Sequence, residues 1–289
     1  MTTVAFVTHR ATPGLAADDR LAADLLESRG VSVIPAVWDD PAVLWPRFAA
    51  VVIRSAWDYH HHARAYADWL RRRAGDGTNL WNPAAAVLAN LDKRYLTELA
   101  GSGVGVVPTT YLPAGGGRSL RDVLAGVGGH EAVVKPAVSA SAHGTWRTSL
   151  ATAAADQGRF EEQSRAGDVL VQPYLSEVAE HGEWSLVFFR GRFSHAVRKR
   201  PAPGDFRVQE EFGGRASGAS PPRGWVEEAA VVLARVGSPL LYARVDAAEH
   251  AGRFALMELE INEPSLFLAH SPEAPARFAE AIEAVLSPR

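Results

Sequence analysis

The sequence predicts an α/β fold for the first part of the chain, followed by a part in which helices mix with antiparallel strands. In the first part, short apolar runs alternate with segments of helical spacing, and such alternation is typical of a parallel sheet with crossover helices. In the last part, a glycine-containing turn joins two apolar runs, which is typical of a β-hairpin. With 289 residues, 47% of them apolar and 22% charged, the composition is that of a globular protein with a sizeable core.

The N-terminal elements follow from short apolar runs and helical spacing. Residues 4–7 are a first strand, VAFV. Residues 18–29 are a helix, because Leu21, Leu25 and Leu26 share one face and Gly30 follows as a helix C-terminal residue often does. The same reasoning predicts strands at 31–35 and 49–53 and a helix at 60–73.

The later elements change character. Residues 75–82 are predicted as a linker, and 201–222, rich in glycine, proline and charge, as a loop over a site. The predicted strands are 132–135, 169–172, 184–189, 193–197, 242–247 and 254–261, with Arg190 and Gly191 at the hairpin turn. The predicted helices are 84–99, 225–236 and 275–286.

Charge and composition exclude several classes of protein. A net charge of −3 argues against a protein that coats nucleic acid or binds an anionic membrane. The absence of cysteine excludes disulfides, thiolate metal sites and a cysteine nucleophile. The first residues read as a strand and not as a signal peptide, and the sequence has no apolar run long enough to span a bilayer. We therefore expect a cytoplasmic protein.

Lysine is rare in this chain and therefore informative. Only three of the 30 basic residues are lysines, namely Lys93, Lys135 and Lys199. A compact ammonium with three donors suits a phosphate oxygen. Lys135 ends an apolar strand in VVKP, where a lone charge is costly unless it is paired. The alternative is chance survival at the surface, which is harder to accept for all three.

Acidic and amide side chains gather at one strand end. In FALMELEINEP, alternation places Leu256, Glu258, Glu260 and Asn262 on one face. Asp246 in YARVDA ends a neighbouring strand. Carboxylate and amide oxygens suit Mg²⁺, which is commonly held by one or two carboxylates together with substrate phosphates. The alternative is a solvated sheet face that carries acids.

With these motifs in order, the chain resembles the ATP-grasp enzymes, especially the glutathione-synthetase and RimK-like branch. The resemblance covers nearly the whole length. It implies an α/β plus α+β protein with an N-terminal parallel-sheet domain and two α+β subdomains that hold ATP between them. We expect a substrate domain at 1–90, a lid subdomain at 91–176 and a catalytic subdomain at 177–289.

The resemblance also implies a nucleotide site. Lys93 in NLDKRY and Lys135 in VVKP fill the positions that touch the phosphates. VQPYL resembles the hinge that meets adenine, so Val171, Gln172, Tyr174 and Leu175 would line it. For the ribose hydroxyls we choose Glu180, with Glu177 and Glu183 as rivals. Two departures are visible: the lid segment SASAHGT has only one glycine, and Gln172 stands where many relatives carry an acid.

The catalytic and metal positions follow in the same way. AVRKRPAPGDFR resembles the basic strand and loop of the family, where Lys199 would reach the γ-phosphate and Arg207 the acyl phosphate or the substrate carboxylate. Asp246, Glu260 and Asn262 match the magnesium ligands in type and spacing. The cofactors implied are ATP and Mg²⁺.

The segment RSAWDYHHH after the third strand is predicted to form part of the substrate site, because ligands of open α/β sheets bind beyond the carboxyl ends of strands. Arg54 could grip a carboxylate with Trp57 or Tyr59 packed on it, or pair with Asp58 instead. The histidines at 60–62 are predicted to be a solvated helix start, because adjacent helical side chains diverge.

The resemblance implies an ATP-dependent ligase that joins a carboxylate or carbonyl to an amine through an acyl phosphate, with small amino-acid-like substrates and no nucleic-acid or membrane partner. An alternative is a ring-closing ATP-grasp ligase, since length and the RSAWDY segment resemble the group that forms D-cycloserine. A non-catalytic nucleotide-binding regulator is a third hypothesis, and a peptide or carrier-protein substrate also remains open. A homodimer is compatible with the resemblance.

Overall fold

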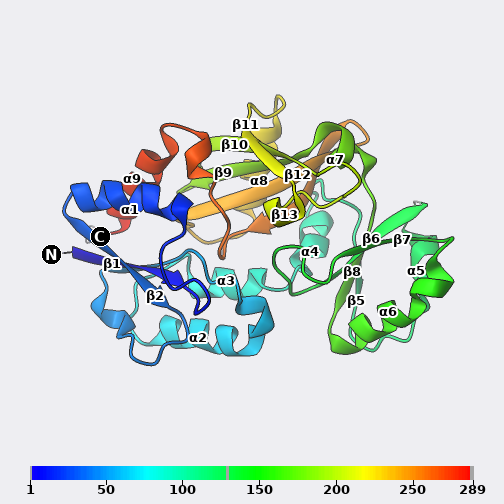
Figure 1. The fold of residues 1–289 in the computed structure, drawn as a ribbon, viewed down its shortest axis with the longest axis horizontal. Helices are drawn as coiled ribbons and strands as arrows, with labels where there is room; N and C mark the ends of the chain where they lie inside the picture. The colour runs from blue at the N-terminus through cyan, green and yellow to red at the C-terminus, as the bar shows by residue number, and fades with distance from the viewer. Residues whose placement is uncertain (1, 128–129, 287–289) are drawn as a thin grey trace.

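The computed structural model describes residues 2–127 and 130–286, and these form three sheets (Figure 1). The first sheet belongs to the N-terminal unit, the second to a central unit and the third to a C-terminal unit. The mixture of one parallel sheet and two antiparallel sheets confirms the predicted fold class. The domain boundaries at residues 90 and 176 stay a prediction.

The N-terminal sheet is parallel, as the alternation of strands and helices predicts, and has the order β2-β1-β3-β4. Its strands are β1 (Thr2–Thr8), β2 (Val31–Val37), β3 (Ala50–Ile53) and β4 (Leu80–Trp81). The connecting helices are α1 (Ala17–Ser28) and α2 (Ala63–Gly75), with short 3₁₀ turns η1 (Trp45–Arg47) and η2 (Tyr59–His61).

The single helix predicted at 84–99 is two helices, α3 (Ala84–Asn90) and α4 (Tyr95–Gly101). Between them, the Asp92 carboxylate accepts a hydrogen bond from the backbone N–H of Arg94 at 2.8 Å, and the backbone N–H of Lys93 donates to Ala137 O at 2.9 Å. These bonds replace helical ones, because an aspartate side chain offers the backbone a local alternative to the helix. The break turns Lys93 out of the helix.

The central unit is an antiparallel sheet of order β5-β8-β6-β7 covered by two helices. Its elements are β5 (Thr110–Leu112), α5 (Leu120–Gly126), β6 (Glu131–Pro136), β7 (Trp146–Ser149), α6 (Ala153–Ala166) and β8 (Val169–Pro173). The buried apolar cluster under these helices draws all its members from residues 112–171. In Figure 1 this unit stands apart from the N-terminal sheet on the far side of α4.

The C-terminal sheet is antiparallel with the order β11-β10-β9-β12-β13. Its strands are β9 (Glu183–Phe189), β10 (Arg192–Arg200), β11 (Arg215–Gly218), β12 (Tyr242–His250) and β13 (Arg253–Glu260). The accompanying helices are α7 (Ser176–His181), η3 (Glu210–Phe212), α8 (Trp225–Ala234), η4 (Leu268–His270) and α9 (Ala274–Leu286). The hairpin predicted at Arg190 and Gly191 is present, with φ of 49° and 76° in the left-handed region.

The loop predicted at 201–222 contains the short 3₁₀ turn η3 and then β11, which pairs with β10 and extends the sheet by one strand. A second difference lies in β13, where the pairing with β12 shifts after the pair Asp246–Glu258, so that Ala247 faces Leu256. Such a bulge breaks the strict alternation of side chains. Leu256 is therefore buried in the core with Leu259, whereas the sequence predicted it on the face of the acids.

The N-terminal and C-terminal units share a core. Helix α9 lies beside α1 (Figure 1), and its Phe278 ring packs against Phe6 of β1 and stacks on Phe189 of β9, with centroids 6.4 and 5.0 Å apart. One buried cluster accordingly mixes residues from the first and the last part of the chain. Among the described residues, no helix is long and apolar enough to cross a membrane.

Asn82 adds polar bonds to this shared interface. Its buried side chain donates to the backbone oxygens of Tyr242 and Ile261 at 2.8 and 2.7 Å, and accepts from the N–H of Leu241 at 2.6 Å. The Tyr242 hydroxyl donates to Asn262 O at 2.6 Å. The chain leaving the first sheet is thus fixed to the strands that carry the predicted magnesium ligands.

Candidate active site

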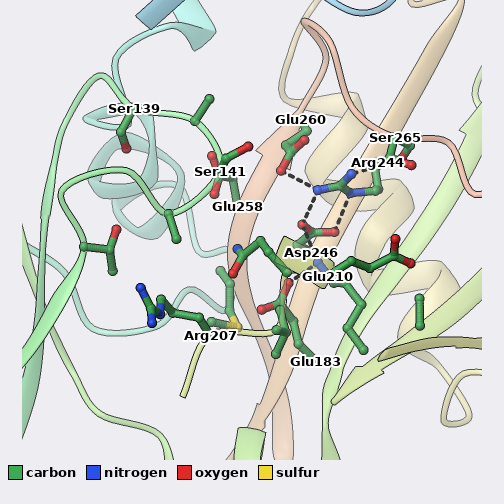
Figure 2. Close-up of a pocket in the computed structure, with 18 of the residues that line it drawn as sticks. Ser139, Ser141, Glu183, Arg207, Glu210, Arg244, Asp246, Glu258, Glu260 and Ser265 are labelled. Carbon is green, nitrogen blue, oxygen red and sulfur yellow. Dashed lines mark hydrogen bonds and ion pairs between the residues drawn. The ribbon is translucent and has the colours of Figure 1, made fainter. Parts of the chain in front are cut away.

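A cavity of about 870 Å³ opens between the three sheets. Its wall includes side chains that the sequence singled out from all three units (Figure 2). The predicted site residues that line it are Trp57, Tyr59, Lys93, Lys135, Gln172, Tyr174, Leu175, Glu183, Lys199, Arg207, Asp246, Glu260 and Asn262. Arg54, Val171 and Glu180 do not line it.

Strand register places the centre of the site. Lys199 of β10 faces Glu183 of β9, and Asp246 of β12 faces Ser185 of β9. The Lys199 ammonium is paired with the Glu183 carboxylate and lies 3.1 Å from Asp246 Oδ2, and Ser185 Oγ donates to Asp246 Oδ1 at 2.6 Å. Gly182 allows this approach, because a Cβ there would lie 2.7 Å from Lys199 O and its φ is 86°.

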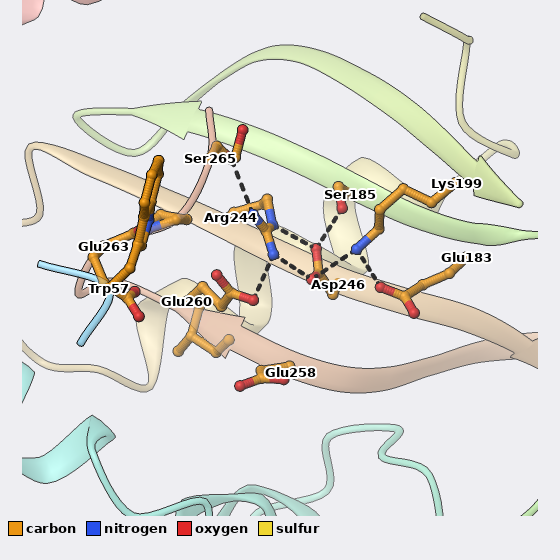
Figure 3. A network of polar contacts seen from close by, with 12 residues as sticks. Trp57, Glu183, Ser185, Lys199, Arg244, Asp246, Glu258, Glu260, Glu263 and Ser265 are labelled. Carbon is orange, nitrogen blue, oxygen red and sulfur yellow. Dashed lines mark hydrogen bonds and ion pairs between the residues drawn. The ribbon is translucent and has the colours of Figure 1, made fainter. Parts of the chain in front are cut away.

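Arg244 joins the two predicted magnesium-binding carboxylates (Figure 3). Its Nε and Nη2 donate to the Asp246 carboxylate at 2.9 and 2.8 Å, and Nη2 also donates to Glu260 Oε1. Nη1 donates to Ser265 O at 3.0 Å. Arg244 lines the cavity and was missed by sequence reasoning, because one arginine among so many carries no compositional signal.

The pKa values of the carboxyl groups on this wall are shifted in opposite directions. Burial alone acts to raise the pKa of Asp246, but Arg244 and Lys199 hold that pKa well below its ordinary value. Burial raises the pKa of Glu260 to about 8, against the opposing effect of Arg244. Burial also raises the pKa of Glu263 to about 7. A buried carboxyl group with a raised pKa gains from a cation beside its ionised form, as a bound metal ion would be.

Asn262 completes the metal-ligand set in chemical type. Its Oδ1 accepts a hydrogen bond from the Tyr66 hydroxyl at 2.7 Å, which fixes the amide, and its side chain is 4% exposed. Asp246, Glu260 and Asn262 lie on one wall of the cavity and offer only oxygen ligands. This donor set fits Mg²⁺.

The other two lysines also line the cavity. Lys93 Nζ donates to Ser139 O at 2.5 Å and lies 3.1 Å from Glu258 Oε1. Lys135, at the end of β6, has no ion pair with any described residue, and burial lowers its pKa. A buried ammonium without a partner is costly, so this lysine is suited to an anionic ligand.

The predicted adenine hinge is only partly exposed to the cavity. Gln172, Tyr174 and Leu175 line it, whereas Val171 is fully buried in the core of the central unit. Gln172 Nε2 donates to Thr109 Oγ1 at 2.9 Å, which leaves its amide oxygen available. The Val171 side chain is therefore a core residue, and the contact of this hinge with adenine through backbone groups stays a prediction.

The choice of Glu180 for the ribose hydroxyls is not supported. Glu180 is exposed on α7 and lies outside the cavity, and its rival Glu177 lies 3.7 Å from His250 Nδ1. Helix α7 turns both acids away, whereas Glu183 on β9 lines the cavity. Of the three acids, Glu183 alone lines the cavity, and a contact with the ribose stays a prediction.

Arg207 enters the cavity from the loop before η3 (Figure 2). Its Nη2 lies 2.7 Å from Asp205 Oδ2, and its guanidinium stacks 3.6 Å from the centroid of the Phe212 ring. These contacts hold the half-exposed side chain in place.

Trp57 and Tyr59 line the cavity as the sequence predicted. The indole Nε1 of Trp57 donates to Glu263 O at 3.1 Å, and the Tyr59 hydroxyl contacts Ser139 O at 3.4 Å. Glu263 itself lines the cavity and was missed, because it follows the strand whose alternation guided the prediction.

Arg54 is a structural residue and not a substrate ligand. It is 2% exposed, its Nε donates to Asp19 Oδ1 at 2.8 Å, and its Nη2 donates to Pro264 O at 2.8 Å. The alternative partner, Asp58, instead accepts a hydrogen bond from the indole of Trp38 at 2.9 Å. The ion pair we considered exists, but with a partner on α1.

Known structures share this fold over nearly the whole chain. A crystal structure of D-alanine–D-alanine ligase from Bacillus anthracis matches with a TM-score of 0.72 and 13% identity, covering 99% of this chain and 96% of that one. The ATP-grasp ligase PsnB complexed with minimal precursor, Mg and ADP matches with a TM-score of 0.64 and 17% identity, covering 98% of both chains. The fold is that of the ATP-grasp ligases.

A closer relationship defines the family. The cycloserine biosynthesis protein DcsG of Streptomyces lavendulae is 34% identical over 273 residues, which is 90% of either chain. A crystal structure of D-cycloserine synthetase DcsG has a TM-score of 0.86 and 31% identity, and covers 99% of this chain and 100% of that one. Residues 4–82 match the family model described as the N-terminal domain of D-cycloserine synthetase DcsG. The chain therefore belongs to the DcsG family.

Proposed function

We propose that this enzyme closes a cycloserine-type ring within one small amino acid, using ATP to activate the carboxylate. The observation that carries this proposal is the 34% identity to DcsG over nine-tenths of both chains. Trp57 and Tyr59, from the RSAWDY segment, line the cavity and add support. Of the two ligase hypotheses from the sequence, ring closure is the one that this relationship favours.

The chemistry follows from the structure of the product. D-Cycloserine is the cyclic form of β-aminooxy-D-alanine, in which the carboxyl carbon is bonded to the aminooxy nitrogen. A carboxylate oxygen attacks the γ-phosphorus of ATP, and ADP leaves with the electron pair of the broken P–O bond. The aminooxy nitrogen then attacks the acyl-phosphate carbon, phosphate leaves and the nitrogen loses a proton. Such phosphoryl transfer depends on positioning and charge neutralisation and not on a protein nucleophile.

The chain offers cationic side chains for each negative centre. We assign Lys93 and Lys135 to the ATP phosphates and Lys199 to the transferring γ-phosphoryl. Arg207 is assigned to the substrate carboxylate and its acyl phosphate. Their geometry supports this, since all four side chains line the cavity.

We assign Mg²⁺ to Asp246, Glu260 and Asn262, with Arg244 beside the first two. The metal would supply charge neutralisation on the phosphate oxygens. The presence of Mg and ADP in the PsnB complex supports this choice.

Glu263 and Trp57 are suited to the amino group of the substrate. The buried Glu263 carboxyl lines the same cavity as Arg207, and the Trp57 indole lies beside it through its bond to Glu263 O. A carboxylate held at low exposure gains most from an ammonium partner. We therefore place the substrate α-ammonium at Glu263.

The test is an assay of ADP release with Mg²⁺-ATP and β-aminooxy-D-alanine, free or substituted on the aminooxy nitrogen, with the product identified by mass spectrometry. We expect one of these compounds alone to drive ADP release and to yield the cyclic product. The L-enantiomer and Glu260→Ala serve as controls and should give little ADP.

A requirement for two different compounds, one acid and one amine, would show an intermolecular ligase instead. Dependence on a peptide or a carrier protein would overturn the small-molecule assignment. ATP binding without turnover on any of these substrates would support the regulator hypothesis.

Two further assignments belong to the proposal. We place the enzyme in the cytoplasm, and we propose a homodimer, which sedimentation equilibrium would test. A mass equal to one chain at micromolar concentration would contradict the dimer.

A further inference from the structure

Three histidines outside the catalytic wall come together from two units. His60 and His61 lie in η2, after β3 of the N-terminal sheet, and His143 lies in the loop between β6 and β7. Their ring centroids are separated by 3.9 Å for His60–His61, 5.3 Å for His60–His143 and 5.0 Å for His61–His143. One ring nitrogen from each lies within 4.8 Å of the others.

The sequence analysis predicted that the side chains of residues 60–62 diverge, and this is true of His62 only. His62 diverges, and its ring packs near Trp38 with centroids 6.4 Å apart. His60 and His61 stay adjacent because η2 is a single 3₁₀ turn, and the third ring comes from a loop 82 positions further along the chain, which local sequence cannot reveal.

The chemical state of His60 suits a metal ligand. Its Nδ1 is buried and has no hydrogen-bond partner among the described residues. A neutral imidazole with a free lone pair is the form that binds a transition metal.

The three nitrogens lie within 4.8 Å of one another, so a tetrahedral site requires them to come somewhat closer together. Zn–N bonds of about 2.0–2.1 Å place the ligand nitrogens of such a site about 3.4 Å apart. His61 and His143 are exposed, so small side-chain rotations can draw their nitrogens together. Three imidazoles suit Zn²⁺, Ni²⁺ or Cu²⁺ and not Mg²⁺, which prefers oxygen.

We propose that His60, His61 and His143 form a binding site for a divalent transition metal ion such as Zn²⁺, separate from the carboxylate wall. The ion connects η2 of the N-terminal unit to the loop between β6 and β7. This loop also carries Ser139 and Ser141, which line the cavity. A bound ion therefore restrains a segment of the nucleotide-site wall and slows the release of nucleotide.

The experiment titrates Zn²⁺ into metal-free protein without nucleotide and follows binding by calorimetry, with a chromogenic chelator as competitor. We expect one equivalent per chain. His61→Ala and His143→Ala remove exposed side chains, so neither opens a cavity, and each should weaken binding by at least about tenfold, a loss that even outer-shell changes produce.

Two variants serve as controls. His62→Ala removes the neighbouring histidine that points away, and Glu260→Ala removes a carboxylate of the catalytic wall. Both should bind Zn²⁺ as the wild type does. Loss of binding in Glu260→Ala with full binding in His143→Ala would place the ion at the carboxylates and overturn the proposal, as would the absence of stoichiometric binding by the wild type.

The restraint is measured separately as the rate of ADP dissociation in stopped flow. Zn²⁺ should slow this rate in the wild type and leave it unchanged in His143→Ala. Equal rates with and without Zn²⁺ in the wild type would overturn the role in nucleotide release.

Discussion

Replacing Arg54 by methionine should destabilise the fold and leave substrate binding intact. Arg54 and Asp19 are each 2% exposed and are joined by a 2.8 Å ion pair. Removal of the guanidinium leaves the Asp19 carboxylate buried without a counter-charge. It also removes the hydrogen bond that Arg54 Nη2 donates to Pro264 O. Breaking a buried pair from one side costs about 3–5 kcal/mol of unfolding free energy. With a urea m-value of about 3 kcal/mol/M, the unfolding midpoint should fall by roughly 1–2 M.

The assay is urea unfolding followed by tryptophan fluorescence, combined with steady-state ADP release. The matched control is the double variant Asp19→Leu, Arg54→Met, which replaces the pair by apolar side chains and should recover most of the loss. A single variant with an unchanged unfolding midpoint and a KM for the substrate acid raised many-fold would refute the structural role and restore Arg54 as a substrate ligand.

Three other outcomes test the site. Lys135→Met should keep or raise the unfolding midpoint while weakening ATP binding about 10- to 100-fold, the equivalent of one charge-assisted hydrogen bond; reduced stability with unchanged ATP affinity would contradict a phosphate role. If Glu183 holds the ribose, the wild type should prefer ATP to 2′-deoxy-ATP, Glu183→Gln should lose that preference and Glu180→Gln should keep it; equal behaviour of the two variants would argue against Glu183. Glu260 and Glu263 have pKa values raised from 4.5 to about 8 and about 7, so the folded state keeps protons that the unfolded state loses near pH 4.5, and the stability of the metal-free protein should fall as the pH rises from about 5 to about 8. Thermal unfolding in EDTA measures this slope, which Glu260→Gln should reduce; a wild-type midpoint that rises over the same window would contradict the raised pKa values.

The local sequence pattern was sufficient to predict most of the fold and part of the site. Strands β1 and β3 of the first sheet are apolar runs, and their burial can be predicted from the local sequence alone. The three lysines stood out because arginine supplies the other positive charges, and all three line the cavity. Asp246, Glu260 and Asn262 were visible because strand ends carry them into one wall.

The wrong predictions arise mostly from contacts between residues that are far apart in the sequence. Arg54 is satisfied by Asp19 on α1, 35 residues earlier, so its own neighbourhood gave no sign of an internal ion pair. Glu180 and Glu183 are three residues apart in the sequence. Glu180 is exposed on helix α7, whereas Glu183 begins the buried strand β9. Leu256 changed faces because of a bulge that only the pairing of β12 with β13 determines.

The self-contained core of the central unit has a mechanical consequence. Its main buried cluster comes from residues 112–171 alone, and among the described residues this unit contributes only Ala137 and Leu170 to the buried cluster of the C-terminal sheet, so rotation of the unit as a rigid body exposes little buried apolar surface. The other two units share a buried cluster and the hydrogen bonds of Asn82, so moving them apart would expose apolar surface and strand buried polar groups. The free-energy cost of opening the cavity is therefore lowest along one direction, in which the wall carrying Lys135 and Gln172 swings away from a fixed wall carrying Asp246 and Asn262. Hydrogen exchange should consequently divide the molecule into one slowly exchanging frame and one independently fluctuating lobe.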